Sequence, residues 1–467
     1  MGYIGSVFLW KLFIQAVDMA FSKTSGFLLV LLLVFGFITS KAQNASTPES
    51  FVPESWNVHF QTTFFPMYHG TVPALYPGNP GVGSLVDSPE LNASLTSTLY
   101  TARRLWKDGA LYVDLEMAAG SGFSNVTGMA GFPNGEIYRV SSADPKVIFA
   151  RYYLKQVLGL GGEQENIKGD EDQLAEKIDI SRVTLTVGRF ALVDFFDNNT
   201  YSHDPRSQFT NWAMWANGAW DYAADTPGYT WGIYFELNQK DWAVRLASTL
   251  EELYPNTSTM DPNIAKAQGN QVEFEYRYAV ENHPGKVRLQ AYLNDADMGN
   301  FSQALALAAQ TGTTPDITQT RSYSAKYGFG INAEQEVGED LGLFTRLGWN
   351  DGQHEVWSFT AIDQTAQLGF LLSGNRWGRP QDQFGLGGVI NGLSSQHQAY
   401  LAAGGVDFII GDGQLNYAPE KILETFYNFH PIKEVGLTLD FQWVTNPAYN
   451  QDRGPLGIVG GRCHFEI

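Results

Sequence analysis

The sequence predicts an all-β protein: a transmembrane antiparallel β-barrel of about 16 strands, with 18 also allowed by the length. The composition fits a β-rich protein, since aromatic residues make up 14% of the 467 residues, glycine accounts for 48 and charged residues for only 17%. Most segments alternate apolar and polar residues over about ten positions. After Ala42 no apolar run is long enough for a spanning helix.

The N-terminal segment is typical of an export signal. From Met19 the chain reads "MAFSKTSGFLLVLLLVFGFITSKAQ", in which Lys23 precedes an apolar run and the small residues Ser40 and Ala42 follow it. We expect residues 1–42 to be a signal peptide, with Met19 as an alternative start, and residues 43–467 to form a single barrel domain. Two short membrane helices are the alternative interpretation of this segment.

The strands are predicted by a two-residue period that continues to the last residue. In "GYTWGIYFEL" the residues Trp231, Ile233 and Phe235 share one face, and "NQK" then joins this strand to a second one starting near Trp242. The segments "NQVEFEYRYAVE", "KVRLQAYL", "SRVTLTVGRF", "LGLFTRLGW" and "GLTLDFQWV" alternate in the same way. Such strands give a sheet with one apolar and one polar face.

A soluble β-sandwich and a membrane barrel both have two-faced strands, so other features must separate them. Aromatic residues such as Trp56, Trp349 and Trp443 gather near strand ends, as interfacial girdles require. The polar faces carry Arg and Glu in mid-strand, which suits a wet lumen. The strand lengths also match the roughly 9–11 residues needed to cross a bilayer. These features favour the barrel.

Charge and motifs exclude several function classes. The net charge of -19 argues against nucleic acid as a partner, and Cys463, the single cysteine, allows neither an internal disulfide nor a thiolate metal cluster. The eight His residues form no H-E-x-x-H motif, and neither G-x-S-x-G nor a phosphate-binding loop occurs. We therefore expect neither an enzyme nor a bound metal or cofactor.

Four blocks of the chain resemble the carbohydrate-selective outer-membrane porins of the OprB type. They are "GFSNVTGMAGFPNGEIYRV", "VTLTVGRFALVDFFDNNTYSHDPRSQFTNWA", "NGLSSQHQAYLAAGGVDFIIGDGQLNYAPEKILETFY" and "NPAYNQDRGPLGIVGGRCHFEI". The resemblance implies a 16-stranded barrel that passes sugars passively into the periplasm. Outer-membrane barrels commonly end on an aromatic residue read by the assembly machinery. This chain departs from that pattern, because it ends on Ile467 with Phe465 two residues earlier.

The stretch "HDPRSQFTNWAMWANGAWDY" lies in a gap of about 40 residues between two predicted strands, and loops of that length are usually functional. We expect it to fold into the lumen, with a short helix capped by Asp204 and Pro205. Sugar contacts are predicted for Asp194, Asp197, Arg206, Asn211, Trp212 and Trp215. The alternative is structural: the Trp rings anchor the loop, and Arg206 pairs with Asp197 or Asp204.

Further charged candidates lie outside that stretch. Glu136 and Arg139 follow a Gly- and Pro-rich turn and are expected to set a field across the pore from a second inward loop. Strand parity places five arginines on the lumen face: Arg182, Arg245, Arg277, Arg288 and Arg346. Their alternative role is to balance nearby carboxylates. A helix capped by Ser394 or Ser395 and ended by Gly404 is predicted, and the run 170–172 reads as a solvated acidic loop.

The predicted function is selective, passive diffusion of carbohydrates across the outer membrane of a Gram-negative-type bacterium. The expected partners are the permeating sugars, outer-membrane lipid and lipopolysaccharide, and the barrel assembly machinery, in a monomeric or trimeric pore. One alternative is a general porin for ions and small solutes. The other is a secreted β-sandwich lectin or glycoside hydrolase.

Overall fold

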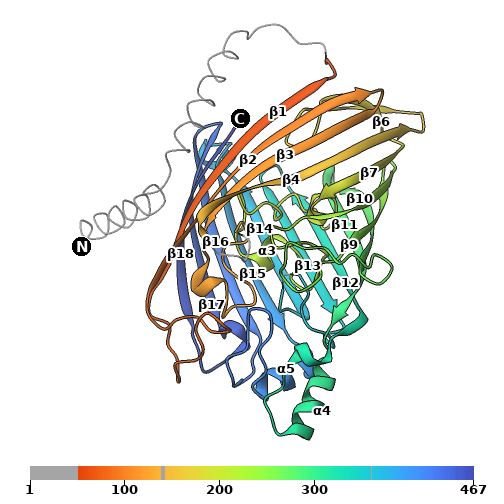
Figure 1. Ribbon diagram of the computed structural model, residues 1–467. Coiled ribbons are helices and arrows are strands. Elements are labelled where there is room, and N and C mark those ends of the chain that lie inside the picture. The colour runs from red at the N-terminus through yellow and green to blue at the C-terminus, as the bar shows by residue number, and fades with distance from the viewer. Residues whose placement is uncertain (1–50, 138–141, 359) are drawn as a thin grey trace.

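The computed structural model describes residues 51–137, 142–358 and 360–467, and over these ranges the chain forms a closed antiparallel barrel (Figure 1). Sixteen strands close the ring, because β1 pairs with β2 on one side and with β18 on the other. The prediction of about 16 strands is confirmed, and the assignment of residues 1–42 lies outside the described residues. The barrel strands are β1 Trp56–His69, β2 Glu90–Trp106, β3 Gly109–Gly120, β4 Ser142–Gly159, β7 Arg182–Phe190, β8 Thr230–Asn238, β9 Trp242–Leu250, β10 Gln268–Val280, β11 His283–Met298, β12 Ser322–Val337, β13 Leu341–Asn350, β14 Gln364–Ser373, β15 Gln383–Gly392, β16 Glu420–Ile432, β17 Val435–Thr445 and β18 Leu456–Glu466.

The two faces of each strand differ as the two-residue period predicts. Along β12 and β17 buried and exposed positions alternate, and the exposed ones are mostly apolar, including Phe329, Ile331, Leu439 and Phe441. These side chains make an outer surface that suits lipid. The buried polar residues, such as Arg346, point into the barrel, where they can pair with one another. This arrangement is that of a membrane barrel and excludes the soluble sandwich.

The two ends of the barrel differ in their connections. At the end that carries the C-terminus, most strands are joined by short turns, such as residues 281–282 between β10 and β11 (Figure 1). The exception is a small hairpin, β5 Gln164–Ile167 and β6 Glu176–Asp179, inserted between β4 and β7. The opposite end carries the long loops, with helices α4 Phe301–Thr311 and α5 Ser395–Ala402 (Figure 1). Among the described residues, no helix has the length and apolar character needed to span a bilayer.

The predicted helix at 395–402 is confirmed in detail. Ser394 is its N-cap and accepts a hydrogen bond from the backbone N–H of His397, and Gly404 follows its C-terminal end with a φ of +94°. Short 3₁₀ turns complete the inventory of helical elements: η1 Phe123–Asn125, η2 Leu192–Asp194, η3 Ile317–Thr320, η4 Gly374–Trp377 and η5 Pro447–Tyr449.

Residues 191–229, here called the inward loop, connect β7 to β8 through the interior of the barrel (Figure 1). The loop carries the largest apolar core of the molecule, in which Phe209, Met214 and Trp220 are almost completely buried. Its helix α3 spans only Trp212–Trp215 and is capped by Asn211. The predicted cap at Asp204 is therefore wrong: Asp204 instead starts a tight turn, in which its carboxylate accepts the backbone N–H of Arg206 and the hydroxyl of Ser207.

Candidate functional site

The inward loop is held across the lumen by charged side chains of the barrel wall. Asp197 receives the guanidinium of Arg346 at 2.9 Å and the amide of Asn332 at 2.7 Å, and all three residues are buried. On the other side of the barrel, Arg462 donates to the carbonyl oxygens of Pro205 and Gln208. Both attachments bury a guanidinium group inside the protein. Breaking either one would leave a buried charge without its partners, so the two attachments fix the position of the loop.

Asn211 is a second anchor of the loop. It is fully buried, its side-chain oxygen caps α3, and its side-chain nitrogen donates to the carbonyl of Gly131 and to Gln442 on β17. Neither Asp197 nor Asn211 lines the cavity described below. Their buried contacts instead tie the loop to the barrel wall and to the β3–β4 loop.

A cavity of about 290 Å³ remains between the inward loop and the wall formed by β3, β4 and the end of β7. Five of the candidates from the sequence line it: Glu136, Asp194, Arg206, Trp212 and Trp215. The neighbouring β3–β4 loop contributes Phe132 and Gly135 as well as Glu136, so two inward-facing loops meet here. Arg139 lies outside the described residues.

Aromatic rings form one side of the cavity. The ring of Trp212 stacks on Phe132 with centroids 5.0 Å apart, and the edge of Trp215 meets Trp212 at 4.8 Å. The indole nitrogen of Trp215 lies against Gly135, so close that a β-carbon at this position would fall 2.0 Å from it. A glycine is therefore required here for the ring to keep its place. Such flat apolar surfaces bind the C–H faces of sugar rings.

Charged groups form the other sides. Arg206 donates from Nε to Glu136 at 2.8 Å and reaches Glu116 at 3.4 Å and the hydroxyl of Tyr100 at 3.2 Å. The alternative pairing of its guanidinium with Asp197 or Asp204 is not observed, since its ion pairs are with Glu136 and Glu116. Asp194 holds Arg151 through two short bonds of 2.7 and 2.8 Å. Both guanidinium groups thus present fixed donor edges at the cavity.

Protonation states follow from burial. Burial and the nearby Arg346 lower the pKa of His203, so its ring is neutral at neutral pH. Burial alone would raise the pKa of Asp204, but the charge of Arg206 and the hydrogen bond from Ser207 lower it, and this carboxylate stays ionised. The cavity therefore combines fixed charges of both signs with a neutral imidazole.

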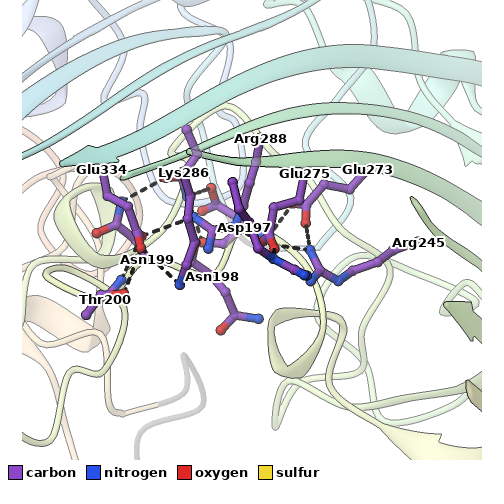
Figure 2. A network of polar contacts seen from close by, with 12 residues as sticks. Asp197, Asn198, Asn199, Thr200, Arg245, Glu273, Glu275, Lys286, Arg288 and Glu334 are labelled. Atoms are coloured by element: carbon purple, nitrogen blue, oxygen red, sulfur yellow. Dashed lines mark hydrogen bonds and ion pairs between the residues drawn. The ribbon is translucent and has the colours of Figure 1, made fainter. Parts of the chain in front are cut away.

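The remaining arginines from the sequence lie on strands of the barrel wall and do not line the cavity. Figure 2 shows Arg245 and Arg288 among their carboxylate partners. Arg245 pairs with Glu236, Glu273 and Glu275, and Arg288 pairs with Glu275 and Glu334. Arg277 pairs with Glu275 at 2.6 Å. Arg182 lies where β7 begins and pairs with Glu165 of the β5–β6 hairpin. Strand parity placed these arginine side chains in the lumen, but it could not show that each forms ion pairs with carboxylates of the barrel.

Sequence reasoning missed several cavity residues. Arg151 and Glu116 lie on the wall opposite the inward loop, Tyr229 is the last residue of that loop, and Glu171 comes from the turn of the β5–β6 hairpin. The alternation on β3 and β4 could have identified Glu116 and Arg151 as lumen-facing. No local signal marks Glu171. Among the described residues, no group of three or more His, Cys, Asp or Glu side chains is arranged to hold a metal ion.

Comparison with known proteins adds the family. A family model described as "Carbohydrate-selective porin, OprB family" matches residues 83–467, while no curated protein matches the chain. The high-pH structure of Pseudomonas putida OprB superposes with a TM-score of 0.67 at 16% identity and covers 88% of this chain and 94% of that one. Its low-pH structure gives a TM-score of 0.46 at 14% identity, covering 88% and 93%.

The outer membrane channel DcaP of Acinetobacter baumannii gives a TM-score of 0.49 at 8% identity, covering 91% of this chain and 100% of that chain. The family match covers most of the chain and agrees with the closed 16-stranded barrel. The protein is an outer-membrane channel for the passive diffusion of carbohydrates. The chain belongs to the OprB family of carbohydrate-selective porins.

Proposed function

We propose that sugars cross the barrel through the cavity beside the inward loop, and that its aromatic and charged lining gives the channel its selectivity. One observation carries this proposal. Within the part of the chain that the structure describes, four buried polar atoms that line the cavity have no hydrogen-bond partner in the protein: Glu136 Oε2, Glu171 Oε1, His203 Nδ1 and Trp215 Nε1. A polyhydroxylated solute can donate to the first two and accept from Trp215.

The roles of the lining follow from its chemistry. Trp212 and Trp215 are each 5% exposed, and the parts of their rings that border the cavity provide apolar contact to the sugar. Arg206 donates and Glu136 accepts hydrogen bonds with hydroxyl groups. Asp194 acts by orienting Arg151. Because these contacts are reversible, a sugar can enter and leave without covalent chemistry, and we propose that the protein catalyses no reaction.

The other candidates are proposed to hold the channel in shape. Asp197 and Asn211 fix the inward loop, and Arg245, Arg277 and Arg288 balance carboxylates on the wall. Arg182 anchors the β5–β6 hairpin. Arg139 stays a prediction for the β3–β4 loop.

Further proposals concern the cellular context. The apolar outer face suits outer-membrane lipid and lipopolysaccharide as neighbours, and the assembly machinery is the expected folding partner. Residues 1–42 are proposed to be removed on export, leaving residues 43–467 as one barrel domain. Size analysis in detergent distinguishes a monomeric from a trimeric pore.

The test is single-channel recording in planar bilayers with a neutral hexose added. In the wild-type channel the sugar should reduce the ion current in a saturable manner. Trp212→Ala should weaken that block about five-fold because it removes one stacking surface. Trp443→Ala removes an indole from the outer face, where 43% of it is exposed, and should leave the block unchanged. A wild-type channel that hexose neither blocks nor crosses would favour a general porin for ions and small solutes.

A further inference from the structure

The hairpin β5–β6 folds inward over the end of the lumen that carries the short turns. Its turn is tied to β1 and to the residues just before β1, since the backbone N–H of Glu54 donates to the carbonyl of Ala175 at 2.8 Å and Asn57 donates to the carbonyl of Gln173 at 3.2 Å. Leu174 is completely buried in the main core. The prediction of a solvated acidic loop at 170–172 is wrong for Glu171 and Asp172, whose side chains are partly buried inside the barrel.

The turn of this hairpin reaches the sugar cavity. Glu171 lines the cavity, and Asp172 lies 3.4 Å from the guanidinium of Arg151, the same group that Asp194 of the inward loop holds. Asp172 adopts a left-handed backbone with a φ of +50°, which turns the chain sharply at this point. The cavity is therefore bounded by the inward loop on one side and by the hairpin turn on another.

The charge of the cavity is unbalanced. Five carboxyl groups line it against two guanidinium groups, and the remaining titratable base, His203, is neutral at neutral pH. Four of the carboxyl groups outnumber the two cations at neutral pH, and Glu171 adds its charge above that pH, because burial raises its pKa to about 8. The carboxylates are Glu116, Glu136, Glu171, Asp194 and Asp204, and the cations are Arg151 and Arg206. Both arginines are ion-paired with carboxylates, which offset their positive charge, while their remaining N–H groups can still donate to hydroxyl groups. A cleft lined by one excess charge concentrates solutes of the opposite sign and excludes those of the same sign.

We infer that the turn Glu171–Asp172 of the β5–β6 hairpin is a specificity-determining element of the channel, which excludes anionic solutes and favours neutral and cationic ones. Sugar acids and sugar phosphates are thus poor cargo, whereas neutral and amino sugars pass. The inference rests on the proposed passage of solute through this cavity. It extends that proposal, because the hairpin acts from the end of the barrel opposite the long loops.

The experiment measures charge selectivity in two ways. Reversal potentials under a KCl gradient give the permeability ratio of potassium to chloride, and liposome swelling compares glucosamine, glucose and gluconate. Measurements are made at pH 9, because burial raises the pKa of Glu171 to about 8 and its carboxyl is then ionised. The wild-type channel should prefer potassium and should pass glucosamine faster than gluconate.

The variants are Glu171→Gln and Asp172→Asn, with Glu163→Gln as the matched control. Glu171→Gln and Asp172→Asn should each lower the permeability ratio of potassium to chloride by about three-fold. This is the effect expected for removing one charge a few ångströms from the path of the ions in a water-filled pore. Glu163 lies at the base of the same hairpin, with 69% of its side chain exposed, and its substitution should leave the ratio unchanged. Heat-modifiable migration in detergent verifies that each barrel is folded.

The inference is overturned by a wild-type channel that passes gluconate as fast as glucosamine, or by equal potassium-to-chloride ratios in the wild type and in the Glu171→Gln and Asp172→Asn variants. An equal loss in Glu163→Gln would also overturn it, because the effect would then come from overall charge. Glucose permeation distinguishes a failure of the hairpin's role from a failure of the proposed sugar path. If glucose crosses while charge selectivity is absent, only the role of the hairpin fails; if glucose does not cross, the proposed sugar path fails.

Discussion

The two sides of the lumen use the same residue types for different purposes. On the wall formed by β9 to β13, Arg245 and Arg288 are each bonded to at least two carboxylates, and the loop residues 197–200 bind into this network (Figure 2). On the side of β2 to β4, Arg206 and Arg151 are also paired, but they border a cavity in which polar atoms have no partner in the described chain.

The difference shows how a rigid scaffold and a binding surface can be told apart. A network in which each charge is neutralised by protein gains nothing from a solute, and it holds the inward loop in place. Gln271 Nε2 and Gln290 Nε2 on β10 and β11 also have no hydrogen-bond partner among the described residues, but they do not line the cavity. The unpartnered acceptors and donors that do line it gain hydrogen bonds when a sugar arrives. We therefore expect substitutions in the ion-paired wall to change folding stability, and substitutions in the cavity to change permeation.

The largest effect is expected for Asp197→Ala, which removes a carboxylate from the ion-pair network of the wall formed by β9 to β13. The substitution leaves Arg346, which is fully buried, without its carboxylate, and this should cost about 3 kcal/mol of folding stability. The inward loop should also loosen, so single-channel conductance should rise. Heat-modifiable migration measured against temperature reports the first effect, and planar bilayers the second. Asp170→Ala, an exposed change, is the control; equal behaviour of the two variants would contradict the anchoring role.

A second pair of variants compares one arginine from each side. Arg206→Met should weaken the block of ion current by a neutral hexose about ten-fold, because a charged donor is lost from the cavity. Arg288→Met should lower stability by about 2 kcal/mol, since Glu275 and Glu334 lose a buried partner, while leaving the sugar block intact. If Arg288→Met altered the block as strongly as Arg206→Met, the distinction between the two sides would fail.

A third prediction uses pH. Burial raises the pKa of Glu171 to about 8, above the ordinary value for a glutamate, so this carboxyl is mostly protonated at pH 7 and charged at pH 9. The potassium-to-chloride ratio should therefore rise about two-fold over this interval, and Glu171→Gln should flatten the rise. The charged groups that act on Glu171 are Arg206 and Asp204 of the inward loop, Arg151 of β4 and Glu466 of β18. An identical rise in Glu171→Gln would assign the titration to another group.

The smallest effect is expected for Arg277→Ala. The side chain of Arg277 is 27% exposed. When the Arg277 side chain is removed, Glu275 keeps Arg245 and Arg288 as partners. The unfolding free energy should fall by no more than about 1 kcal/mol, as for other partly exposed pairs. The same thermal assay measures it. A loss as large as that of Arg288→Met would show that the wall network is less redundant than its contacts indicate.

The fold was predictable because its signal is local. A two-residue period repeats in every strand, and parity alone placed Arg245, Arg277 and Arg288 in the lumen. The helix at 395–402 was equally readable, since Ser394 and Gly404 mark its two ends. The inward loop was indicated by its length and composition, which are visible without any knowledge of its contacts.

The site was predictable only in part, because it depends on contacts between distant segments. Asp194 and Asp197 are three residues apart and look alike in the sequence, yet the first borders the cavity with Arg151 and the second is buried against Arg346. The capping signal at Asp204 was misread because its carboxylate serves a turn, whereas Asn211 caps the helix. The acidic turn at Glu171 looked solvated, since nothing in its own residues reveals that the hairpin folds inward.

The seam between β1 and β18 has a consequence for how the protein is made. Thr63 pairs with His464 and Tyr68 with Val459, so the first barrel strand finds its second neighbour only in the last one along the chain. One edge of β1 therefore has no partner in any chain that lacks β18. A chain that stops short of β18 leaves two unpaired edges, which invite pairing with other chains or degradation. The barrel can therefore close only in a chain that extends through β18.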